Sequence, residues 1–73
     1  MVNQPVTDIE SNAHSAIKDY LDGRLDLDMS VRIINNSGLR GIRLAMLVYG
    51  LSGHKNQDGY YRMNSWLQDV GLY

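Results

Sequence analysis

Three aspartates lie close together and could do chemistry, because carboxylate oxygens bind divalent cations. Asp22, Asp26 and Asp28 occupy the stretch DGRLDLD. A calcium loop also needs a mid-loop glycine and a closing glutamate at fixed spacing, and this stretch has neither pattern. On an extended strand Asp26 and Asp28 would share one face about 7 Å apart. We interpret them as a solvated acidic face and predict no metal site and no cofactor.

The residues available for nucleophilic catalysis are sparse. His14 lies between Ser11 and Ser15 on a predicted helix, where neighbouring positions supply no cleft to hold a nucleophile and its base. His54 falls in the polar loop 52–59 and is expected to be solvated. The chain has no cysteine and no phosphate-binding loop. We expect no enzymatic activity.

Aromatic residues gather near the C-terminus, where four of the six lie in the last fourteen positions. Tryptophan, tyrosine and arginine dominate protein interfaces, because each buries a large area when it binds. The alternative is that the tryptophan and one tyrosine anchor the last helix to the core. We predict a protein-binding surface formed by Tyr60, Tyr61, Arg62, Trp66 and Tyr73.

Two helices are predicted at the ends of the chain. Thr7 and Glu10 have the spacing of a capping box, an apolar stripe follows at helical spacing, and Gly23 fits a helix C-terminus. This pattern predicts a helix over about 8–22, preceded by flexible residues 1–6. Apolar residues from position 60 onward predict a second helix over about 59–70.

Residues 24–33, RLDLDMSVRI, alternate apolar and polar side chains without a break. This two-residue period favours a half-buried strand over about 24–34. A strand needs a neighbour for its open edge, so we expect it to pair with the same strand of a second copy, or with a partner's sheet. The alternative is a short helix that begins at Asp28 and buries Val31 and Ile34.

A central helix is predicted over about 38–51, with Ser37 as its N-terminal cap. Leu39, Ile42, Met46 and Tyr49 recur along one stripe, and further apolar residues surround that stripe. A helix that is apolar on nearly all sides is expected to be buried on nearly all sides. The rival interpretation is a second strand that forms a hairpin across the turn 35–38.

Together these elements predict one small domain, residues 1–73, of an α-rich α+β class with three helices and one strand. The alternative is an all-helical bundle with a helix-turn-helix-like middle. With 73 residues and no cysteine, the chain supports only a small core, which favours stabilisation by a partner or by homodimer formation.

Two resemblances suggest a DNA-binding alternative. The element order strand–helix–helix over 24–70 resembles ribbon-helix-helix repressors, although it would place aspartates against phosphates. Residues 30–50, SVRIINNSGLRGIRLAMLVYG, resemble a helix-turn-helix with Gly38 in the turn, which implies DNA contacts by Arg40 and Arg43, with Lys55 nearby. The second helix would offer few polar side chains to read bases.

The charges are unevenly distributed along the chain, although the net charge is only −1. Residues 1–29 hold six acids and two bases, and residues 30–73 hold five bases and two acids. No apolar run is long enough to cross a membrane and the N-terminus does not resemble an export signal, so we expect a cytoplasmic protein. The predicted function is a small regulator or inhibitor that binds another protein, of the kind common among phage or mobile-element accessory proteins.

Overall fold

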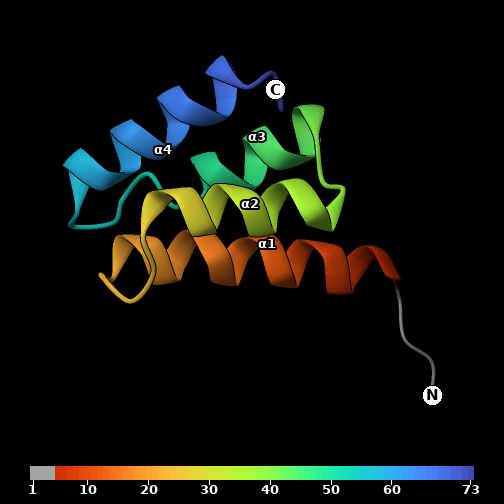
Figure 1. Ribbon diagram of the computed structural model, residues 1–73, viewed down its shortest axis with the longest axis horizontal. Helices are drawn as coiled ribbons and strands as arrows, with labels where there is room; N and C mark the ends of the chain where they lie inside the picture. Colours follow the sequence, from red (N-terminus) through yellow and green to blue (C-terminus); the bar gives the residue numbers. More distant parts are fainter. Residues whose placement is uncertain (1–4) are drawn as a thin grey trace.

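The computed structural model describes residues 5–73, with side chains from Ile9 onward, and this part of the chain contains four helices and no strand. The chain reverses direction at each connection (Figure 1). The predicted α+β class is therefore wrong, and the fold is all-helical, the class of the alternative. The helices are α1 (Pro5–Leu21), α2 (Leu27–Ser37), α3 (Gly41–Tyr49) and α4 (Gln57–Asp69).

The two terminal helices lie close to their predicted positions. α1 begins at Pro5, so Thr7 lies inside the helix and not at its N-terminal cap. Proline suits the start of a helix, because the first amides have no partner within it. The expected looseness of residues 1–6 falls partly on residues 1–4, which lie outside the described part of the chain. α4 differs from its predicted range by two residues at its start and one at its end.

Residues 27–37 form a helix where a strand was predicted. The Asp26 carboxylate caps this helix, since Oδ1 accepts a hydrogen bond from the Met29 amide at 2.8 Å. Leu27 and Val31 belong to the alternating pattern, but with Ile34 they also recur at spacings of four and three, which forms a helical stripe. The helix satisfies its own backbone, whereas a single strand could not. The predicted dimer through paired strands is therefore wrong.

A buried serine connects α2 to α1. Ser30 is fully buried, and its hydroxyl donates a hydrogen bond to the Ala16 carbonyl oxygen at 2.8 Å. Ser30 is one of the polar residues in the alternating stretch 24–33, so the expected strand would place it on the polar face. Ala13 and Ala16 are also buried, and their small side chains allow α2 to approach α1 closely. This bond fixes the position of α2 along α1.

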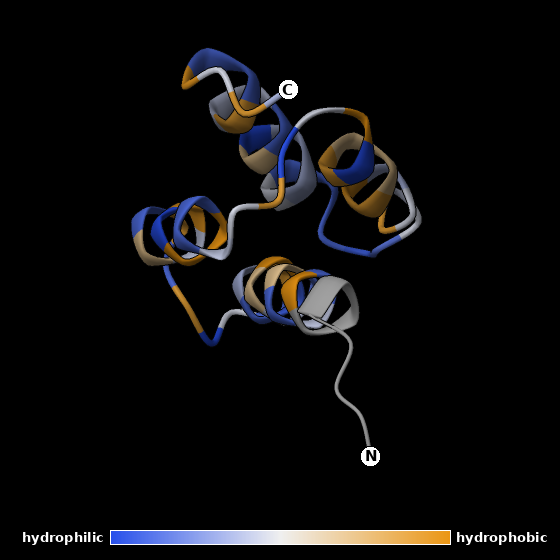
Figure 2. Ribbon diagram, turned by 90° about the vertical axis from the view of Figure 1, so that its right-hand side faces the viewer, coloured by the Kyte–Doolittle hydropathy of each residue, from blue (hydrophilic) through white to orange (hydrophobic). Residues whose placement is uncertain are grey.

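The four helices surround one core, as Figure 2 shows in a view approximately along them. α1 contacts each of the other three helices, and its most extensive contact is with α2. The largest fully buried apolar side chains come from all four helices: Ile17, Ile34, Leu44, Val48, Met63 and Leu67.

The start of α3 is held by the C-terminal tail. The Gly41 amide donates a hydrogen bond to the Leu72 carbonyl oxygen at 2.7 Å, and α3 has no side-chain cap. The prediction that Ser37 caps this helix is wrong: its hydroxyl donates to the Ile34 carbonyl and accepts from the Leu39 amide, so it closes α2 instead. α3 is also shorter than predicted, because Gly38 and Gly41 both adopt positive φ.

Asn56 joins the end of α1 to the start of α4. Its Nδ2 donates to the Leu21 carbonyl oxygen and its Oδ1 accepts from the Gly59 amide, both at 3.0 Å. A Cβ atom on Gly59 would lie 2.5 Å from Asn56 Nδ2. Gly59 is thus required for the close approach of the capping side chain.

We expect Ser30→Ala to lower the free energy of unfolding by about 1 kcal/mol, the usual net value of one hydrogen bond. Urea denaturation measures the change. The matched control is Ser11→Ala on the exposed face of α1, which should change stability by less than about 0.5 kcal/mol. Equal effects of the two substitutions would contradict a special role for Ser30.

Gly59→Ala should destabilise the protein by about 1 kcal/mol, because the methyl group displaces the Asn56 cap. In an ordinary helix the same change stabilises by a similar amount. The control is Gly53→Ala, where a Cβ atom meets nothing within 4 Å. Thermal unfolding of both variants distinguishes the cases, and a more stable Gly59→Ala protein would disprove the steric argument.

Candidate functional site

The five residues of the predicted protein-binding surface lie on two different sides of α4. Tyr61, Arg62 and Trp66 line a hollow between α4 and α2. Tyr60 and Tyr73 line another hollow, between α4 and α3. The fold therefore divides the aromatic cluster into two surfaces.

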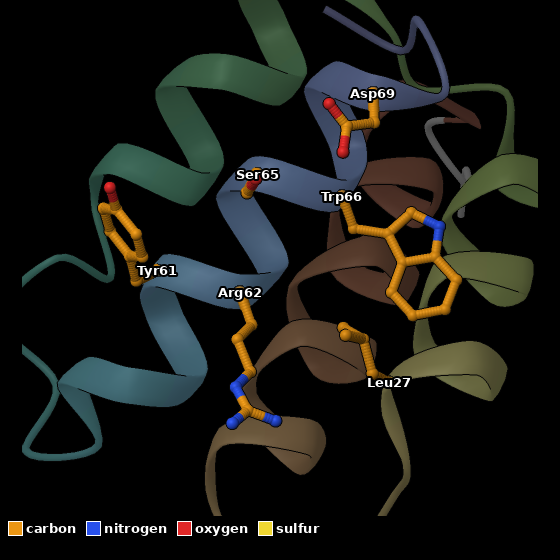
Figure 3. A pocket seen from close by; sticks show the side chains of 6 residues that line it. All are labelled: Leu27, Tyr61, Arg62, Ser65, Trp66 and Asp69. Carbon is orange, nitrogen blue, oxygen red and sulfur yellow. The ribbon is translucent and has the colours of Figure 1, made fainter.

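The hollow between α4 and α2, which we call the Trp66 groove, has a volume of about 460 Å³. Figure 3 shows Trp66 and Leu27 facing each other across it, with Arg62 extending beside Leu27, whereas Tyr61 points away from the indole. Trp66 is half-buried and Tyr61 is 75% exposed. The lining residues are Leu27, Tyr61, Arg62, Ser65, Trp66 and Asp69.

The groove combines an apolar floor with charges of both signs. Arg62 and Asp69 form no ion pair with any other side chain of residues 9–73. Trp66 also lines a smaller adjoining hollow of about 230 Å³, formed with Val31, Val70 and other residues of α2 and the C-terminus. Such a surface can bury an apolar side chain and pair with a charged one. The sequence pattern missed Leu27, Ser65 and Asp69, because their place beside Trp66 depends on how α2 packs on α4.

The second hollow, between α3 and α4, has a volume of about 320 Å³. Three side chains of α3 beside it are strongly exposed: Ile42 by 77%, Met46 by 68% and Tyr49 by 75%. We call this surface the α3 face, and it consists of Ile42, Ala45, Met46, Tyr49, Tyr60, Asn64 and Tyr73.

The prediction that the central helix is buried on nearly all sides is wrong. α3 packs into the core through Leu44 and Val48, while the stripe that contains Ile42, Met46 and Tyr49 faces outward. The stripe was visible in the sequence, but it was assigned to the core. Both sides of this short helix are apolar, so the pattern could not say which side faces inward.

Tyr73 is held at the edge of the α3 face. Its hydroxyl donates a hydrogen bond to Asn64 Oδ1 on α4. Burial raises the pKa of Tyr73 above its ordinary value, and nearby Tyr60 adds to the effect. The hydroxyl therefore stays protonated at neutral pH, and the face carries no charge there.

The residues predicted for DNA contact do not form one basic surface. Arg43 pairs with Glu10 on α1 at 2.8 Å, and Arg40 donates to Asn35 Oδ1 at 3.0 Å. Lys55 lies in the connection after α3, at the opposite end of that helix from Arg40. A turn over 38–40 does join α2 to α3. However, the outward face of α3 is apolar and has little that could read base edges.

His54 is mostly buried and not a solvated loop residue as predicted. Its Nε2 lies 2.8 Å from Asp22 Oδ1, and its Nδ1 accepts a hydrogen bond from the Asn56 amide at 2.9 Å. Since a backbone amide can only donate, the proton of the neutral ring is on Nε2 and points to Asp22. Neither ring nitrogen is free to act as a base, so this pair fastens the α3–α4 connection to the end of α1.

Metal-ligating groups are dispersed over the described part of the chain. Residues 5–73 contain no group of three or more His, Asp or Glu side chains that could hold a metal ion. Asp22 pairs with Lys18 and His54, Asp26 caps α2, and Asp28 lies near Arg32. Each aspartate of DGRLDLD thus has a structural partner.

Comparison with protein-family models, with curated proteins and with solved structures finds no match. None of the helices in residues 5–73 has the length and apolar character needed to span a bilayer.

The contact of Asp22 with His54 and Lys18 predicts that the stability of the protein depends on pH. Hydrogen bonds from His54 and then Lys18 lower the pKa of Asp22 below its ordinary value. A carboxylate of this kind stabilises the fold above its unfolded pKa, about 4, and loses that effect as the pH falls through its lower folded value. We expect Asp22→Asn to be less stable than the wild type at neutral pH, with a difference that shrinks below about pH 4.

Urea denaturation at neutral pH, at about pH 5 and at about pH 3 tests this expectation. The control is Asp69→Asn, which removes the same charge from a carboxylate without an ion pair among the described side chains. The Asp69→Asn protein should differ little from the wild type at all three pH values. A deficit of Asp22→Asn that stays constant down to the lowest pH would contradict the assignment.

Proposed function

We propose that this chain is a small, non-catalytic regulator or inhibitor that acts by binding another protein through the Trp66 groove. The observation that carries the proposal is a half-buried tryptophan beside a strongly exposed tyrosine and an arginine that has no ion pair among the side chains of residues 9–73. Tyrosine, tryptophan and arginine are the residue types that contribute most to binding energy at protein interfaces.

The chemistry of the groove suggests what the partner presents. Leu27 and Trp66 would receive an apolar side chain, because burying it removes apolar surface from water on both sides. Arg62 would meet a carboxylate, since its planar guanidinium can pair with both carboxylate oxygens. We therefore propose a partner segment that carries an apolar anchor next to an acidic residue.

DNA binding is the weaker proposal for this chain. The turn between α2 and α3 supports it, but Arg40 and Arg43 are already engaged by Asn35 and Glu10. A helix that reads DNA projects polar side chains into the major groove. The outward residues of α3 are mainly apolar, which favours the protein-binding proposal.

The cytoplasmic location, the phage or mobile-element origin and the homodimer also belong to this proposal. Size, composition and the absence of cysteine support the first two. The segment expected to form the dimer is a helix, so a dimer of this chain would need another surface.

Affinity capture of the full chain from its native host, followed by calorimetry with the co-eluting protein, tests the proposal. We expect Arg62→Glu and Tyr61→Ala each to weaken binding about tenfold or more, because both side chains lie beside the groove. Both side chains are exposed, so these variants should fold normally.

The matched control is Arg24→Glu, which makes the same charge change at an exposed arginine outside the groove. It should leave the affinity within about twofold. If the chain instead binds duplex DNA with a steep salt dependence, and loses that binding in Arg40→Ala and Arg43→Ala, the DNA-binding function replaces this one.

A further inference from the structure

The α3 face is an exposed apolar surface that the Trp66 groove does not use. Ile42, Met46 and Tyr49 lie at positions i, i+4 and i+7, so they form one continuous apolar stripe on the outside of the bundle. Monomeric proteins seldom expose apolar patches of more than a few hundred Å², and larger ones mark interaction sites. A partner that covered this stripe would remove its apolar side chains from water.

We propose that the α3 face is a self-association surface, on which a second copy of the chain packs with its α3 antiparallel to the first. This surface differs from the Trp66 groove and would form the homodimer named with the proposed function, whereas binding of another protein through the groove does not depend on it.

The charge of the face favours a second copy as the occupant. A two-fold interface brings the same patch of each copy together, so any charge on it would meet its like. The seven residues of the α3 face include no Asp, Glu, Lys, Arg or His. The face offers no charged side chain to a partner that binds through opposite charge, whereas a second copy of the same face can pack on it without charge repulsion.

The ends of α3 favour the antiparallel direction. α3 has no acidic residue in its first turn and no basic residue in its last turn, so its dipole is not compensated at either end. Arg40 and Arg43 lie at the N-terminal end, where positive charge is unfavourable. Both guanidinium groups are held within the same chain, Arg43 by Glu10 and Arg40 by Asn35. Antiparallel packing places the amide end of each α3 beside the carbonyl end of its copy, so the two uncompensated helix dipoles attract each other.

The spacing of the stripe also suits this arrangement. Met46 lies near its middle, with Ile42 and Tyr49 on either side. Antiparallel pairing would therefore place Met46 against Met46 and Ile42 against Tyr49, and Ala45 leaves room for close approach. The stripe consists of three exposed side chains on a helix of nine residues. We therefore expect a contact smaller than the roughly 800 Å² per partner of a standard interface, and a dimer of micromolar affinity.

Sedimentation velocity of the full chain, from micromolar to millimolar concentration, tests the proposal. We expect reversible dimers, and we expect Met46→Glu to weaken the dimer about tenfold or more by burying a charge against its copy. The matched control is Met29→Glu, which makes the same change at a methionine of α2 that is 43% exposed and outside the face. Far-ultraviolet circular dichroism confirms that both variants fold.

Single cysteines test whether the two stripes meet and in which direction, since the chain has none of its own. Met46→Cys should form a disulfide-linked dimer under mild oxidation, because disulfides require closely opposed residues. Met29→Cys should remain a monomer. Tyr49→Cys tests the direction. The antiparallel arrangement places Tyr49 against Ile42, so this variant should not link, whereas a parallel pair would place Tyr49 against its own copy. A disulfide-linked Tyr49→Cys dimer would overturn the antiparallel arrangement.

Three other results would overturn the proposal as a whole. The first is a chain that stays monomeric at millimolar concentration. The second is a dimer that Met46→Glu does not weaken. The third is a monomeric chain in which Met46→Glu abolishes capture of another protein, because that partner would then occupy the α3 face. Arg62→Glu should leave the affinity of the dimer unchanged. The dimer experiment therefore tests the α3 face alone, and the binding function proposed for the Trp66 groove is tested separately.

Discussion

The contact between α1 and α2 is the constraint on which the rest of this fold depends. Ser30 donates to the Ala16 carbonyl oxygen inside the apolar core, so the bond persists only if α2 lies at one height along α1. The small side chains of Ala13 and Ala16 make that approach possible. Because α2 also forms one wall of the Trp66 groove, the position of Leu27 opposite the indole follows from the same contact.

The second constraint is the way the chain closes upon itself at both ends of α4. Asn56 joins the start of α4 to the end of α1 by a hydrogen bond. The Leu72 carbonyl oxygen, beyond the other end of α4, accepts a hydrogen bond from the first amide of α3. α4 thus lies between α2 and α3 and presents a different hollow to each. Because α4 faces two hollows, aromatic residues that are neighbours in the sequence, such as Tyr60 and Tyr61, lie on two different surfaces. It also leaves one side of α3 uncovered.

The sequence predicted the terminal helices well, because α1 and α4 each have one apolar stripe and a polar remainder. It failed for residues 24–34, where Leu27, Val31 and Ile34 fit a helix and the alternation with Asp26 and Asp28 fits a strand. The cap at Asp26 and the buried bond of Ser30 decide between them. For the site, composition alone pointed to Tyr61, Arg62 and Trp66, whereas Leu27 and Asp69 carried no signal.

The sequence by itself determined the small apolar core, the two amphipathic terminal helices, the glycine turns and the concentration of aromatic side chains near the C-terminus. These properties depend on residue type and local spacing. Only the tertiary structure decided that residues 27–37 are helical, that α3 faces inward with Leu44 and Val48, and that α4 separates two surfaces. The physical reason is that α3 is apolar on both sides, so contacts with distant residues determine which side is buried.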